Sequence, residues 1–147
     1  MKKRKNKSFF VALIILISVL LIGGIVWYKL YTRDVYILDI PNSYNLSSIV
    51  YEKDSGIVTL YEEEDMDRVL NGLHNLDLET QNVSVQDYPS DVDVLTAIRF
   101  NYREDAVGTL YLYKKNNKYY LEEAYNGVYK LTEEEYKYII NLGNDEM

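Results

Sequence analysis

The chain has 147 residues, with 23 acidic residues against 16 lysines and arginines, so its formal net charge is −7. It contains no cysteine, which excludes disulfides, a thiol nucleophile, cysteine-ligated metals and attachment through a lipidated cysteine. Every acid follows position 33, whereas the first segment, MKKRKNK, is purely basic. Because an acidic surface repels phosphate backbones, we expect no nucleic-acid partner.

Residues 1–8 are predicted to be a basic cytoplasmic tail and residues 9–28 a transmembrane signal anchor. The run from Phe9 to Tyr28 has no charge, and a helix of about 20 residues crosses the roughly 30 Å hydrocarbon core of a bilayer. A cleaved signal peptide also starts with basic residues. Its apolar region is shorter, however, and it ends in small residues, where this chain has GGIVWYKLY. We therefore favour an uncleaved anchor.

The flanking charges predict the orientation of this anchor. Five cations precede the apolar run, while only Lys29 and Arg33 follow it closely. The positive-inside rule then places the N-terminus in the cytoplasm, residues 29–34 as a juxtamembrane linker and residues 35–147 as an extracellular domain. We expect a single-pass protein of the cell membrane, and the lack of cysteine is compatible with a bacterial surface protein.

The first part of the outer segment predicts strands and one helix. VYILDI (35–40) predicts a strand that ends before Pro41, and residues 47–53 and 57–62 predict two strands joined by a turn at 54–56. EEEDMDRVLNGLHNL (62–76) predicts a helix, since its acids crowd the first turn and its apolar residues recur at helical spacing. The apolar positions are Met66, Val69, Leu70, Leu73 and Leu76.

Three features of this region could suggest a metal or a catalytic group. The acidic run Glu62–Asp65 is explained by its place at a helix start, and His74, the only histidine, is explained as a boundary residue of the apolar stripe. Residues 77–86 are ambiguous, with an edge strand as one reading. The loop 87–93 contains three aspartates but lacks the acid spacing, the glycine and the final glutamate of an EF-hand. We predict no metal and no cofactor, and leave calcium at this loop open.

The C-terminal half predicts an antiparallel meander followed by a helix. The strands are 94–102, 107–115, 118–125 and 128–131. Asn116-Asn117 and Asn126-Gly127 are typical two-residue hairpin loops. Thr132 and Glu135 form a capping box, which begins a helix that ends near Gly143.

Strict alternation from these two turns divides the meander into two faces. The first bears Leu110, Leu112, Tyr119, Leu121, Tyr125 and Val128; the second bears Tyr111, Tyr113, Tyr120, Ala124, Tyr129 and Leu131. The predicted fold class is α+β, an antiparallel β-meander sheet packed with two short helices and preceded by the transmembrane helix. We expect a helix on the leucine face, and either the other helix or partial exposure on the tyrosine face.

Three stretches resemble a known family. They are IPNS at residue 40, DYP at residue 87 and TLYLYKKNNKYYLEEAYNGVYKLTEEEY. They are similar to small membrane-anchored proteins of low-GC Gram-positive bacteria that are catalogued as a domain of unknown function. The resemblance covers about residues 35 to 140. It implies an extracytoplasmic α+β module with no assigned activity.

The residues do not favour an enzyme, because the chain lacks the motifs of nucleophilic, phosphate-binding and zinc-dependent catalysis. A carboxylate-pair hydrolase is a weaker reading, since such enzymes need a larger cleft. We predict a binding or accessory module whose candidate binding face consists of Tyr111, Tyr113, Tyr120 and Tyr129. Its expected partner is a surface or membrane protein, or a cationic peptide.

The alternative is a module that binds cell-wall or other glycans. Sugars would stack on the tyrosine face, and polar groups at its rim would fix their orientation. Arg99, Glu122 and the Lys114–Lys118 cluster could supply those groups.

Overall fold

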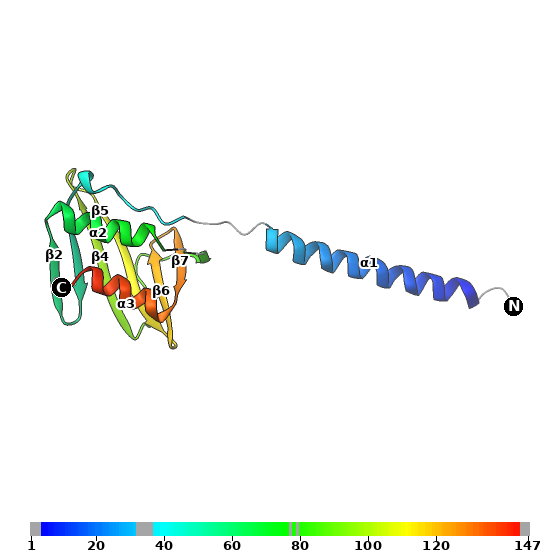
Figure 1. The fold of residues 1–147 in the computed structure, drawn as a ribbon. Coiled ribbons are helices and arrows are strands. Elements are labelled where there is room, and N and C mark those ends of the chain that lie inside the picture. Colours follow the sequence, from blue (N-terminus) through cyan, green and yellow to red (C-terminus); the bar gives the residue numbers. More distant parts are fainter. Residues whose placement is uncertain (1–3, 32–36, 77, 79, 145–147) are drawn as a thin grey trace. The chain divides into compact units, whose positions relative to one another are not determined.

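The computed structural model describes residues 4–31, 37–76, 78 and 80–144 (Figure 1). The chain divides into two compact units, Met1–Asp34 and Val35–Met147. They are described separately.

The first unit is the helix α1 (Arg4–Tyr31). Its stretch Phe9–Tyr28 has a mean hydropathy of 3.1 and none of it is buried, so α1 is long and apolar enough to cross a membrane. The hydroxyl of Ser18 donates to the carbonyl oxygen of Ile14 at 2.9 Å, which satisfies this polar group within the helix. That arrangement suits a hydrocarbon environment, where water is absent.

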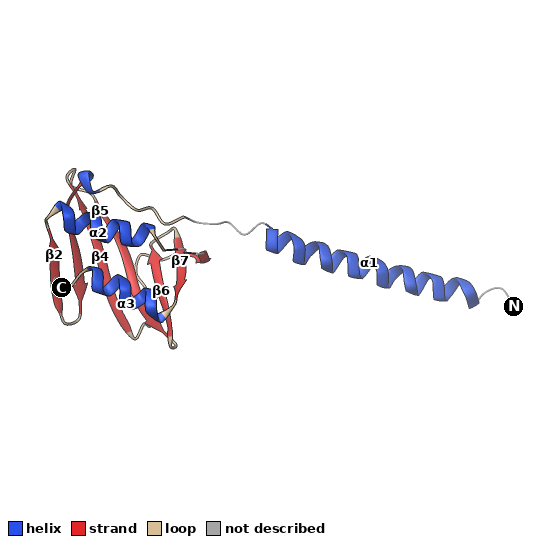
Figure 2. Cartoon of the chain, viewed as in Figure 1, coloured by secondary structure: helices blue, strands red, loops and turns tan. Residues whose placement is uncertain are grey.

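The second unit is a seven-stranded antiparallel sheet in the order β2-β1-β4-β5-β6-β7-β3, and it confirms the α+β class (Figure 2). The strands are β1 (Leu46–Lys53), β2 (Gly56–Leu60), β3 (Thr80–Val83), β4 (Val94–Tyr102), β5 (Val107–Lys115), β6 (Lys118–Glu123) and β7 (Gly127–Leu131). The helices α2 (Glu63–His74) and α3 (Glu133–Leu142) both lie across one face of the sheet, and the short η1 (Ser43–Asn45) precedes β1.

Most of the predicted elements are confirmed. Asn116 and Asn117 both have positive φ, 51° and 59°, and they pair Tyr113 with Tyr120 as expected. Thr132 and Glu135 form both hydrogen bonds of the capping box at the start of α3, and Gly143 follows its end. The ambiguous stretch 77–86 contains β3, which is indeed an edge strand.

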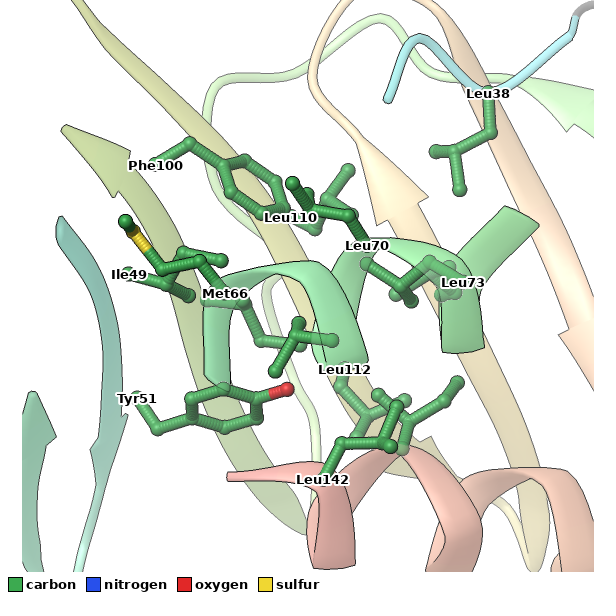
Figure 3. Packing of buried hydrophobic residues seen from close by; sticks show 14 of the residues in the cluster. Leu38, Ile49, Tyr51, Met66, Leu70, Leu73, Phe100, Leu110, Leu112 and Leu142 are labelled. Atoms are coloured by element: carbon green, nitrogen blue, oxygen red, sulfur yellow. The ribbon is translucent and has the colours of Figure 1, made fainter. Parts of the chain in front are cut away.

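The predicted strand at 35–40 is wrong. Residues 37–40 form no strand, and residues 35 and 36 lie outside the described residues. Leu38 nevertheless packs into the core (Figure 3). The backbone is held by side chains instead of a ladder: Glu123 accepts from the N–H of Asp39 at 3.3 Å, and Asn126 donates to the carbonyl of Ile37 at 3.2 Å.

The predicted hairpin at Asn126-Gly127 is also wrong in detail. Strand β6 ends at Glu123, the loop has Tyr125 at φ 59°, and Leu121 pairs with Tyr129. Gly127 is a strand residue, and a Cβ at this position would approach the ring of Tyr129 to 2.9 Å. Glycine is therefore required for close packing and not for positive φ.

The altered register shifts β7 by an odd number of positions relative to the prediction, so its side chains exchange faces. Tyr129 and Leu131 lie on the leucine face, beneath the helices, and Tyr129 has no exposed surface. Tyr125, predicted on the leucine face, is exposed in the loop.

The core lies between the leucine face and the two helices (Figure 3). Met66, Leu70 and Leu73 of α2 pack against strand residues such as Phe100 and Leu112. The ring of Tyr51 lies against Gly143, where a Cβ would approach it to 2.5 Å. With both helices on this side, the tyrosine face is left for another element to cover.

Candidate functional site

The predicted site is the tyrosine face, the side of the sheet opposite α2 and α3. The segment Ser84–Asp93, which joins β3 to β4, contacts this face at several points; we call it the cover segment. Pro89 within it is buried. The cover segment thus does for the tyrosine face part of what the helices do for the leucine face.

The centre of this contact is the carboxylate of Glu122, which is only 1% exposed. Its Oε1 accepts from Ser84 Oγ at 2.6 Å and from Gln86 Nε2 at 3.3 Å, and its Oε2 accepts from the hydroxyl of Tyr113 at 2.9 Å. Among the described residues, no lysine or arginine forms an ion pair with it. Three neutral donors therefore compensate its burial, as a buried carboxylate requires.

Glu122 was predicted at the rim of a glycan site, and that prediction is wrong. Its oxygens are occupied by the cover segment and by Tyr113, so it is part of the internal structure. Burial, followed by the contact with Glu122, raises the pKa of Tyr113 well above its usual value. The phenol therefore stays protonated and remains a donor to the carboxylate.

The structure brings together three of the four predicted tyrosines. Tyr113 is buried and stacks on Tyr120 with ring centroids 5.4 Å apart, while Tyr111 lies on the same face of β5. Tyr111 and Tyr120 are half-buried, so they keep part of their surface accessible. Tyr129 is the exception, because it is buried on the opposite face of the sheet.

Sequence reasoning missed Tyr88 of the cover segment. Its ring meets that of Tyr111 edge-on at 5.3 Å and is still 57% exposed. Beside it, Asp87 accepts a hydrogen bond from the phenol of Tyr125, which raises the pKa of that phenol. The only sequence signal was the DYP stretch in the family resemblance, since a loop that folds over a sheet leaves no periodic pattern.

Most cations of the second unit are engaged within it. Six of the nine lysines and arginines between residues 37 and 144 have a polar partner. The partners are Asp65 for Arg68, Glu52 for Arg99, Glu133 for Lys137, Asn144 for Lys53, the carbonyl of Leu46 for Arg103 and the carbonyl of Ser90 for Lys115. Two of these cations, Arg99 and Lys115, were predicted to orient a glycan at the rim of the tyrosine face. Both already bind a group of the protein itself.

The acids, in contrast, are mostly displayed to solvent. Glu62, Glu63 and Glu64 are exposed before and within the first turn of α2, and the aspartates of the cover segment are exposed as well. No group of three or more acids and histidines among the described residues could hold a metal ion. Because acids also outnumber lysines and arginines in this part of the chain, the second unit has a strongly acidic surface.

His74 is exposed at the end of α2, beside a small half-open hollow. The described lining is otherwise aliphatic, with Leu38, Ile40 and Leu76 among its residues. At about 130 Å³ the hollow is smaller than the usual small-molecule sites of roughly 300–1,000 Å³. The described residues around His74 thus offer it no reacting group.

One comparison with known proteins gives a match. The DUF5301 family, described as "Domain of unknown function (DUF5300)", matches residues 35–130. No curated protein and no solved structure matches the chain. The match covers more than half of the chain, and the chain belongs to the DUF5301 family.

Proposed function

We propose that this member of the DUF5301 family is a single-pass membrane protein whose second unit is an extracytoplasmic module that binds cationic peptide segments. The observation that carries the proposal is the acidic surface. After position 28 the chain has 23 acids against 11 lysines and arginines, and most of the cations within the described part have internal partners. Such a field attracts positively charged segments and accelerates their association.

The anchoring part of the proposal is supported by α1. None of its apolar stretch is buried, and the basic residues that precede it favour a cytoplasmic N-terminus. Because the chain has no cysteine, single cysteines report the topology directly. In intact cells, Ser55→Cys should react with a membrane-impermeant maleimide and Asn6→Cys should not. Labelling of Asn6→Cys but not of Ser55→Cys would show the opposite orientation.

Glycan binding is the second candidate, and one observation favours it: Tyr88, Tyr111 and Tyr120 keep accessible ring surface on the same side of the sheet. Aromatic rings of this kind can stack on sugar rings. The polar rim that should orient a sugar is weakened, however, because Glu122 is buried and Arg99 is paired with Glu52. The acidic field also gives no advantage to a neutral sugar.

Salt dependence separates these two candidates. The full-length protein in micelles of a neutral detergent is titrated with a fluorescent peptide in which lysine and valine alternate, and separately with an N-acetylglucosamine oligomer. Raising the salt from about 0.05 to 0.5 M shortens the Debye length from roughly 14 to 4 Å and should weaken peptide binding at least about tenfold. A salt-independent affinity for the oligomer, with no affinity for the peptide, would replace the first candidate by the second.

A further inference from the structure

The two edges of the sheet are built differently. Strand β3 forms one edge, is four residues long and has an irregular register with β7 between Thr80 and Asn82. Strand β2 forms the other edge and pairs with β1 without any register shift. Its sequence, GIVTL, has no charge and no proline. Charged residues and prolines normally protect an edge strand, because an unprotected edge pairs with other chains. Strand β2 has neither.

The hydrogen-bonding groups that β2 presents outward follow from its register. Lys53 and Gly56 close the two-residue turn, so they form a hydrogen-bonded pair, and the pattern alternates along the hairpin. Val58 and Leu60 therefore bond to β1, while the N–H and C=O groups of Ile57 and Thr59 point away from the sheet. Figure 1 shows β2 as the outermost strand on its side.

Two large apolar side chains are exposed along this edge, and acids lie at both of its ends. Ile57 is 67% exposed and Tyr61, directly after the strand, is 70% exposed. Asp54 lies in the turn at one end, and the run Glu62–Glu64 begins at the other. In an antiparallel pairing of two copies of β2, Asp54 of each copy would approach the acidic run of its partner. Like charges disfavour that arrangement, whereas a cationic strand complements both ends.

We infer that the free edge of β2 is the docking site, where an extended cationic segment of a partner adds as a further antiparallel or parallel strand. This inference rests on the proposed function and specifies its site. The backbone of the segment pairs with Ile57 and Thr59, its apolar side chains continue the surface of Ile57, and its lysines or arginines lie near Asp54 and Glu62–Glu64.

Two variants with the same charge change test the site. Ile57→Lys places a cation on the edge, and Val107→Lys places one at an exposed apolar position of β5, which is 61% exposed. The probe is a peptide of about eight residues in which lysine and valine alternate, added to the full-length protein in neutral detergent. We expect Ile57→Lys to weaken binding about tenfold or more and Val107→Lys to weaken it less than about threefold. If the two variants weaken peptide binding equally, the acidic field alone explains the binding, and the edge of β2 is not the site.

A second probe tests the backbone pairing. The same peptide, N-methylated at every residue, keeps its charge but loses the N–H donors along both edges. Its affinity should fall about tenfold or more, and addition of the unmodified peptide should slow amide hydrogen exchange at Ile57 and Thr59. Equal affinity of the two peptides would overturn strand addition. If no peptide binds to the wild-type protein, the proposed function itself fails. If instead the protein without peptide forms dimers that Ile57→Lys dissociates, the occupant is a second copy and not a cationic segment.

Discussion

Replacement of Glu122 by alanine removes the acceptor that joins the cover segment to the sheet. In the variant, the hydroxyl of Tyr113 and the amide of Gln86 lose a partner at 2.9 and 3.3 Å, and Ser84 keeps only the carbonyl of Gln86 at 3.3 Å. A hydrogen bond to a charged group contributes about 1.5–3 kcal/mol, and an unsatisfied buried donor costs about 1–3 kcal/mol. Relief from burying a carboxylate offsets part of this loss.

We expect the free energy of unfolding to fall by about 3 kcal/mol for Glu122→Ala. For a domain of this size, such a loss lowers the melting temperature by roughly 10–20 °C. In Glu122→Gln, the amide oxygen still accepts from Tyr113, but the amide NH2 group faces the donors of Ser84 and Gln86. The loss of unfolding free energy should therefore be about half as large as for Glu122→Ala.

The assay is urea unfolding of the full-length protein, followed by near-ultraviolet circular dichroism, which reports the packing of the tyrosines. Glu104→Ala, at an exposed position in the loop between β4 and β5, is the matched control and should unfold like the wild type. Peptide binding at the edge of β2 should survive Glu122→Ala at temperatures where the variant is folded. A Glu122→Ala midpoint equal to that of the control would refute the reasoning, because the carboxylate would then not hold the cover segment.

Three further predictions concern the fold. Gly127→Ala should lower the free energy of unfolding by about 1–3 kcal/mol, since its Cβ would approach the Tyr129 ring to 2.9 Å. Gly108→Ala is the control: its Cβ would meet only ordinary contacts, so its stability should be nearly unchanged. Thermal melts of the two variants test this difference. Burial raises the pKa of Tyr129 to about 12, above the unfolded value of 10, so its contribution to stability is complete below pH 10 and is lost between pH 10 and 12. Urea midpoints should drop across that window, and Tyr129→Phe should reduce the drop; an unchanged pH profile of this variant would argue against Tyr129 as a source. Thr132→Ala should lower stability by about 1 kcal/mol through the lost cap of α3 while Thr132→Ser does not, and equal melting temperatures for the two would show that the cap is dispensable.

The sequence was sufficient wherever the cause of a structure is local. Asn116 and Asn117 form the expected turn because asparagine tolerates the left-handed backbone that both positions adopt. Asn126-Gly127 carries an even stronger local signal, but Gly127 lies within β7, where its Cβ would meet the ring of Tyr129 and Thr80 of the neighbouring strand β3. The dipeptide alone does not reveal this packing. The segment 37–40 shows the same limit: its apolar residues predicted a strand, whereas Leu38 packs into the core without a ladder.

The site was less predictable than the fold for the same reason. Three of the four candidate tyrosines do lie together, because the first hairpin fixed their register. Two of the three partners of Glu122, Ser84 and Gln86, lie 38 and 36 residues away in an irregular segment, and no periodicity predicts them. A glutamate that alternation placed at a solvated rim was therefore found in the interior.

The strand order also constrains how the chain folds. Strands β4, β5, β6 and β7 are consecutive hairpins, so they can pair as soon as they are made. Strand β1 must wait for β4, because Ile49 pairs with Phe100 and a loop of about 50 residues has to close first. We therefore expect the C-terminal meander to nucleate folding. The β1–β2 hairpin, with apolar residues on both strands, would then join last, so a newly made chain passes through a period in which that hairpin is open to aggregation or to chaperones.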